Sequence, residues 1–99
     1  MARISKEEAK MLLTDVPGEY VFWCRDGLVF RNMKELRDGL ANMSDETYAY
    51  HANKDKNDFS KWVGDVIKDE KLAAELQNAT SRAEAAKRVD TRVTVLSRR

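Results

Sequence analysis

The stretch that decides the fold runs from residue 51 to residue 62 and reads His51-Ala52-Asn53-Lys54-Asp55-Lys56-Asn57-Asp58-Phe59-Ser60-Lys61-Trp62. It holds the only histidine of the chain, a polar loop, and two aromatic residues three positions apart. We expect His51 to end one helix and Asn57 or Asp58 to cap the next, because these side chains accept hydrogen bonds from free helical N–H groups. Phe59 and Trp62 then share the face that enters the core. The sequence thus predicts a structural clasp made of His51, Asn57, Asp58 and Trp62.

His51 also allows a chemical interpretation, as a general base near neutral pH or as a metal ligand. A zinc site normally needs three or four protein ligands, whereas this chain offers one histidine and one distant cysteine, Cys24. We therefore favour the structural interpretation and expect neither a metal nor another cofactor. An enzyme that uses His51 together with Asp58 is the least favoured alternative.

Cys24 is the second candidate for chemistry. A cysteine paired with a histidine can act as a nucleophile, but no known motif surrounds Cys24, and a free cysteine is usually buried as a small apolar residue. The chain also lacks the glycine-rich phosphate loops and the serine-hydrolase and zinc-protease motifs. We therefore predict that the protein is not an enzyme.

Helical patterns lie on both sides of the clasp. Serine, asparagine or aspartate residues stand where helices are expected to begin: Ser5, Asn32, Ser44, Asp69 and Ser81. The spacing of apolar residues predicts helices at about 6–14, 33–43, 45–51, 58–67, 69–78 and 81–97. The second half of the last helix is rich in β-branched residues, so residues 91–97 would also suit a strand; we favour the helix.

One hairpin is expected near the N-terminus. Residues 19–24 are aromatic and β-branched, which is typical of a strand, and Asp26-Gly27 predicts a two-residue turn to a second strand at 28–31. Alternation places Tyr20, Phe22 and Cys24 on one face. The opposite face carries Val21, Trp23 and Arg25. A lone hairpin is marginal in water, so at least one face must pack on helices, and the face with Val21, Trp23 and Arg25 is the candidate surface for a partner.

Length and composition fit one globular domain. The chain has 99 residues, of which 42% are hydrophobic and 35% are charged, and this size supports one modest core. We predict a single domain over residues 1–99, with its core at about 19–77. Its class is α+β, mostly helical, with one β-hairpin and about five to six short helices. The N-terminus lacks the apolar middle of a signal peptide, no apolar run could span a bilayer, and one cysteine cannot form an internal disulfide, so we expect a cytoplasmic protein.

The C-terminal helix at about 81–97 is basic. Residues 82–99 contain six basic and two acidic residues, although the whole chain has a net charge of only +1. An alternative function is therefore nucleic-acid binding through Arg82, Lys87, Arg88 and Arg92. The same helix carries an apolar seam, which either folds back on the core or pairs with a second copy to give a homodimer. Its residues are Ala86, Val89, Val93 and Leu96.

Several of these motifs occur in an order that resembles a small uncharacterised domain family of archaea and bacteria. They are Phe22-Trp23-Cys24, Asn32-Met33-x-Glu35-Leu36, Met43-Ser44-Asp45-Glu46, Tyr48-x-Tyr50-His51, Asn57-Asp58-Phe59-x-x-Trp62 and Leu72-Ala73. The resemblance covers about residues 19–77, and its most specific part is the His…Asn-Asp-Phe-x-x-Trp signature. It implies a mostly helical domain with a small hairpin. It implies no established activity, substrate or cofactor.

Taken together, these features predict a small non-enzymatic binding or regulatory module. We expect its partner to be a protein, bound through the open face of the hairpin or through the C-terminal helix. No membrane partner is expected.

Overall fold

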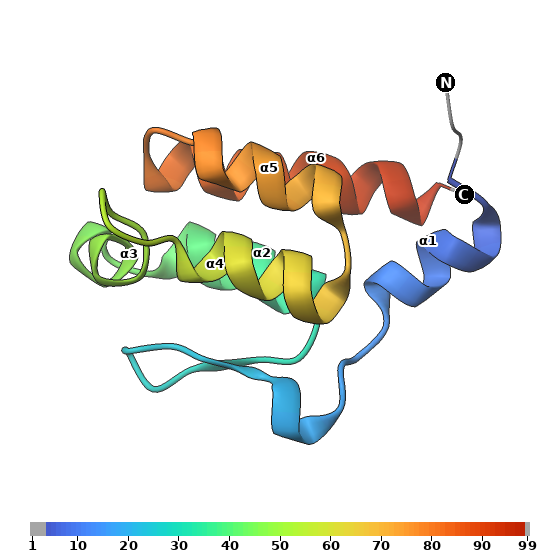
Figure 1. The fold of residues 1–99 in the computed structure, drawn as a ribbon, viewed down its shortest axis with the longest axis horizontal. Helices are drawn as coiled ribbons and strands as arrows, with labels where there is room; N and C mark the ends of the chain where they lie inside the picture. Colours follow the sequence, from blue (N-terminus) through green and yellow to red (C-terminus); the bar gives the residue numbers. More distant parts are fainter. Residues whose placement is uncertain (1–3, 99) are drawn as a thin grey trace.

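The computed structural model describes residues 4–98 and shows helices stacked above a short hairpin (Figure 1). A 3-10 turn, η1, precedes the hairpin, and a π-helical turn, η2, follows α4. The elements are α1 (Lys6–Leu13), η1 (Gly18–Tyr20), β1 (Phe22–Trp23), β2 (Val29–Phe30), α2 (Met33–Asn42), α3 (Asp45–His51), α4 (Asp58–Trp62), η2 (Val63–Ile67), α5 (Glu70–Asn78) and α6 (Arg82–Ser97). The predicted class, α+β and mostly helical with one hairpin, is confirmed.

The helix α6 is the longest element and joins the others. It packs on α2, α1 and α5, and in Figure 1 it lies beside α5 in the upper layer, while α2, α3 and α4 lie between this layer and the hairpin. Its residues Ala85, Val89, Val93 and Leu96 are buried in the same core as Ala9 of α1. The core therefore extends beyond the predicted limits of 19–77 at both ends.

The last helix continues to Ser97, which confirms helix over strand for residues 91–97. Burial of Val89, Val93 and Leu96 against the rest of the chain supplies the free energy that β-branched residues lack as helix formers. Of the two expected roles of the seam, the structure shows that it folds back on the core. Val89, Val93 and Leu96 are buried within one chain, and Ala86 is partly buried against the same core.

The predicted caps are present at the helix starts. In each case the side chain accepts a hydrogen bond from the N–H group three residues later, which typically contributes about 1 kcal/mol. The cap residues are Ser5, Asn32, Ser44, Asn57, Asp69 and Ser81. Asn57, rather than Asp58, caps α4. At the start of α6, the carboxylate of Glu84 accepts a hydrogen bond from the N–H group of Thr80, and not from that of the cap residue Ser81.

The hairpin is shorter than predicted. Phe22 pairs with Phe30 and Trp23 with Val29 in antiparallel register. The connection has three residues between Cys24 and Leu28 instead of two, because Cys24 N–H donates to the Leu28 carbonyl across the loop. Gly27 supplies the positive φ of 95° that this loop needs.

Strand alternation holds for only part of the predicted inner face. Phe22 and Cys24 are buried as expected, but Tyr20 lies in η1 and is 55% exposed. Pro17 and Gly18 start this turn before the strand can begin. The buried ring of Phe30 lies where a Cβ on Gly39 would be, so this glycine lets α2 pack closely against the ring. The close contact at Gly39 is therefore made with a side chain and not with another backbone segment.

The helix that follows the clasp does not run unbroken to Ile67. It widens after Trp62 into the π turn η2, and Lys68 ends it in a left-handed conformation with φ of 74°. The N–H groups of Lys68 and Asp69 both donate to the Val63 carbonyl. This end places Asp69 at the start of α5, where its side chain is buried.

None of the helices within residues 4–98 is both long enough and apolar enough to cross a membrane.

Candidate functional site

His51 lies at the end of α3 and its ring is buried, with 5% of the residue exposed. Its Nε2 atom accepts a hydrogen bond from Arg25 N–H at 3.0 Å, and its Nδ1 atom lies 3.0 Å from Asp58 Oδ2. Because a backbone N–H group can only donate, Nε2 must be unprotonated, and the proton of the neutral ring is on Nδ1 and points to Asp58. His51 thus joins α4 to the hairpin loop, and both of its ring nitrogens are engaged.

Aromatic rings surround His51. The ring of Phe22 lies 5.1 Å away and that of Phe59 lies 5.3 Å away, measured between centroids. Tyr50 meets His51 edge-on at 5.0 Å. The ring is therefore held by packing as well as by hydrogen bonds.

Asp58 is the carboxylate of the clasp. Burial on its own would raise the pKa of Asp58, but the hydrogen bonds from His51 and Lys56 outweigh burial, so the pKa lies below the ordinary value of 3.8. Lys56 Nζ lies 3.1 Å from the same Oδ2 atom that faces His51. A carboxylate held ionised in this way orients the histidine ring and fixes its tautomer.

Trp62 fastens the other end of β1. Its indole Nε1–H donates to the Tyr20 carbonyl at 2.7 Å, and its ring packs edge-on against Phe22. Together with the bond from Arg25 to His51, this contact holds the hairpin strand before its first residue and after its last. The clasp therefore does more than start a helix, because its side chains fix the hairpin to the helical layer.

Asn57 fixes the loop that joins α3 to α4. Its Oδ1 atom caps α4, and its Nδ2 atom donates to the Leu76 carbonyl at the end of α5. Asn53 closes the loop from the other side, since its N–H donates to the Lys56 carbonyl and its Oδ1 atom accepts from Asp55 N–H. The loop is polar and exposed, yet hydrogen bonds define its backbone.

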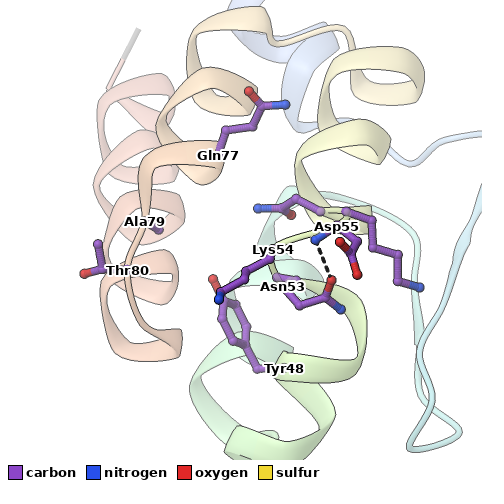
Figure 2. A pocket seen from close by; sticks show the side chains of 10 residues that line it. Tyr48, Asn53, Lys54, Asp55, Gln77, Ala79 and Thr80 are labelled. Carbon is purple, nitrogen blue, oxygen red and sulfur yellow. Dashed lines mark hydrogen bonds between the residues drawn. The ribbon is translucent and has the colours of Figure 1, made fainter.

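A polar cavity of about 470 Å³ lies between this loop and the α5–α6 connection. It is lined by residues 52–57 and by Tyr48, Gln77, Ala79 and Thr80, and Figure 2 shows Tyr48 and Lys54 facing Ala79 and Thr80 across it. Burial and the nearby charge of Glu84 raise the pKa of Tyr48, so its hydroxyl stays protonated. Neither His51 nor Cys24 lines this cavity.

The outer side of the hairpin presents aromatic residues to solvent. Trp23 is 72% exposed, and Leu28 is also exposed. The Arg25 guanidinium lies over the ring of Tyr50, with Cζ 4.3 Å from the ring centroid, and Lys56 Nζ lies 4.9 Å from the same centroid. Of the predicted binding residues, Trp23 and Arg25 are thus exposed, and Val21 is half-buried.

The basic residues of α6 divide into two groups. The Arg82 side chain donates to the carbonyls of Leu40 and Ala41 and pairs with Asp45 at 2.8 Å, so it satisfies the C-terminal end of α2. The Arg92 side chain is 11% exposed and makes two hydrogen bonds with the buried carboxylate of Asp69. Only Lys87 and Arg88 of the four predicted phosphate-binding residues are exposed and without an ion pair within residues 4–98.

Cys24 is buried beside the hairpin loop, and burial raises the pKa of its thiol. A raised pKa disfavours the thiolate that a nucleophile requires. In the part of the chain that the structure describes, no group of three or more His, Cys, Asp or Glu side chains is arranged to hold a metal ion.

Three features of the site carry no local signal in the sequence. The Arg25 N–H and the Tyr20 carbonyl are backbone groups, which any residue supplies. Tyr50 becomes part of the surface only because the fold brings Arg25 and Lys56 to its ring.

The fold and the site define the class of the protein as a mostly helical α+β domain whose hairpin is fastened at both ends and presents an exposed tryptophan. No family model, curated protein or solved structure matches the chain. The resemblance to a small prokaryotic family therefore stays a prediction, and the site described above is the basis for a function.

The lowered pKa of Asp58 makes stability depend on pH. The folded state binds this proton less tightly than the unfolded chain, so the contribution of Asp58 is complete above the ordinary value of 3.8 and is lost as pH falls through the lower folded value. We expect Asp58→Asn to destabilise the protein at about pH 6, and this difference from the wild type to shrink toward about pH 3. Urea unfolding at both pH values checks this, and equal differences would contradict it.

Proposed function

We propose that this chain is a small cytoplasmic, non-enzymatic binding module that engages a protein partner through the outer face of its hairpin. The binding surface consists of Val21, Trp23 and Arg25, extended by Leu28 and Tyr50. The single observation that carries the proposal is the exposure of Trp23, 72% of which is open to solvent. Tryptophan and arginine are the residues most enriched at binding hot spots.

The distribution of exposed apolar side chains supports this surface. Six large hydrophobic residues are exposed within residues 4–98, and four of them lie in or beside the hairpin: Tyr20, Trp23, Leu28 and Tyr50. Scattered single residues need no explanation, whereas apolar residues gathered in one region favour an interaction site. The hairpin is also held in place before any partner arrives, through the bonds from Arg25 to His51 and from Trp62 to Tyr20, which lowers the entropy cost of binding.

The experiment compares Trp23→Ala with the wild type. We expect the variant to keep its free energy of unfolding within about 0.5 kcal/mol, because the side chain is mostly exposed. Affinity for the partner should fall by about 30-fold or more, the effect of losing a hot-spot residue. Capture from a host extract with quantitative mass spectrometry identifies proteins held by the wild type and lost by the variant, and titration then gives the two dissociation constants.

Met11→Ala is the matched control. Met11 is 75% exposed, like Trp23, but belongs to α1 and not to the hairpin. It should leave binding unchanged. Equal retention of all proteins by Trp23→Ala and the wild type would overturn the proposal, and so would equal losses in both variants.

A further inference from the structure

The contact between His51 and Arg25 depends on the protonation state of the ring. Nε2 of His51 accepts from Arg25 N–H at 3.0 Å, while the opposite nitrogen faces Asp58. A neutral imidazole has one donor and one acceptor, which is what this arrangement uses; an imidazolium has two donors and no acceptor. A proton added to Nε2 would thus replace the hydrogen bond by two N–H groups that point at each other.

Four polar groups face the ring or its hydrogen-bond partners. The carboxylate of Asp58 on α4 favours the charged ring, and Lys56 Nζ, bound to the same carboxylate oxygen, opposes it. The guanidinium of Arg25 opposes it as well, and lies over Tyr50, whose ring meets His51 edge-on. The remaining neighbours, Phe22 and Phe59, are apolar. The charges around the ring therefore do not all favour one form.

The contact also lies at a sensitive position in the hairpin. The base of β1 is held by Trp62, whose bond to the Tyr20 carbonyl contains no group that titrates near neutral pH. The loop end depends on Arg25 N–H, in a connection of three residues that are all exposed. Loss of one bond there leaves the base fastened and the loop free to move.

We propose that His51 is a pH-dependent latch on the hairpin loop. When His51 is neutral, it holds Arg25 and the loop against α3 and α4. When it gains a proton on Nε2, Arg25 N–H loses its acceptor and the loop loosens, while Trp62 keeps the base of the strand in place. Histidine is the side chain type whose ordinary change of charge falls between about pH 5 and 8, which sets the pH range for the test.

The test measures hydrogen exchange by NMR at about pH 8 and pH 5, as protection factors corrected for the intrinsic effect of pH. We expect the protection of Arg25 N–H to fall by about tenfold at pH 5, the factor that one hydrogen bond contributes. The indole N–H of Trp62 is the control within the same molecule and should keep its protection. No change at Arg25, or equal losses at both sites, would overturn the proposal.

His51→Gln is the second arm. The glutamine amide oxygen can accept from Arg25 N–H in place of Nε2, but it does not titrate in this range. The variant should keep the protection of Arg25 N–H from pH 8 to pH 5. A fall as large as that of the wild type would contradict the latch, and if the variant does not fold, the comparison of Arg25 with Trp62 in the wild type still decides.

If the proposed function is also correct, acidification should weaken partner binding, because Arg25 belongs to the binding surface. This consequence rests on that function, whereas the exchange measurement does not. A latch that opens without any change in binding would reject the hairpin surface and keep the latch. If Trp23→Ala abolishes binding but the exchange of Arg25 N–H does not change with pH, the latch is rejected and the hairpin surface is kept.

Discussion

Arg92→Met should lower the free energy of unfolding by about 3–5 kcal/mol, the range for breaking one half of a buried ion pair. In the wild type, Arg92 Nε and Nη2 donate to the two carboxylate oxygens of Asp69 at 2.7 and 3.1 Å. The Asp69 side chain is only 1% exposed. Without Arg92 its charge stays buried with one remaining hydrogen bond, from Leu72 N–H. Since small domains are stable by only about 5–15 kcal/mol, this loss is a large share of the total.

The expected loss in the free energy of unfolding is large because of where the ion pair lies. Asp69 caps α5 directly after the left-handed residue Lys68, so a single carboxylate begins one helix and binds another, α6. Arg92 lies close enough to the surface to keep part of its hydration, whereas Asp69 does not. Removal of the arginine should therefore cost more than removal of the carboxylate charge by Asp69→Asn, which keeps the cap.

The double variant Asp69→Asn with Arg92→Met tests this cause. It removes both charges and keeps the hydrogen bond to Leu72 N–H, so it should be more stable than Arg92→Met alone. Lys87→Met is the control for losing a positive charge on the exposed side of α6, with an expected effect within about 0.5 kcal/mol. Urea unfolding of the four variants gives the comparison. Arg92→Met as stable as Lys87→Met would show that the buried pair contributes little.

This pair also shows where reasoning from sequence stops. Local patterns correctly predicted the helix starts, because a cap such as Ser5 or Asn32 bonds an N–H group three residues away. Apolar spacing likewise predicted the seam of α6, although it left open whether the seam packs on the core or on a second copy. Asp69 and Arg92 are 23 residues apart, and nothing in either segment indicates that the other will lie against it. Arg92 looked like a phosphate ligand because its charge was visible in the sequence and its partner was not.

The hairpin shows the same limit at shorter range. Strand composition and the Asp26-Gly27 turn predicted that a hairpin forms, but the loop has one residue more than the two-residue pattern, and η1 takes Tyr20 out of the strand. The clasp was predicted from the residue types of the stretch from 51 to 62. The main contacts of the clasp could not be predicted, because His51 and Trp62 bind backbone groups at the hairpin that are 26 and 42 residues away in the sequence. Backbone groups carry no signature in a sequence.

His51→Ala is expected to destabilise the protein by about 3–5 kcal/mol. Replacing a buried ring by alanine leaves a cavity between Phe22 and Phe59, for which large-to-small changes cost about 2–5 kcal/mol. The two hydrogen bonds to Arg25 and Asp58 are lost as well, each with a net contribution of about 0.5–1.5 kcal/mol. Chemical unfolding measures the sum, since a two-state transition is expected for a domain of this size.

Tyr50→Ala and His51→Asn separate the causes of this loss. Tyr50 is next to His51 but about half exposed, so its removal should cost less than half as much. His51→Asn keeps an amide N–H near the position of Nδ1 and can still donate to Asp58, so it should recover part of the stability. A catalytic histidine contributes chiefly to a reaction and can be replaced with little effect on stability. If His51→Ala unfolds like the wild type, within about 1 kcal/mol, the structural role is wrong and His51 becomes the first residue to test for chemistry. If stability falls as expected, the buried ring is what fixes the hairpin to the helices, and the exposed Trp23 is left as the group to follow in a search for a partner.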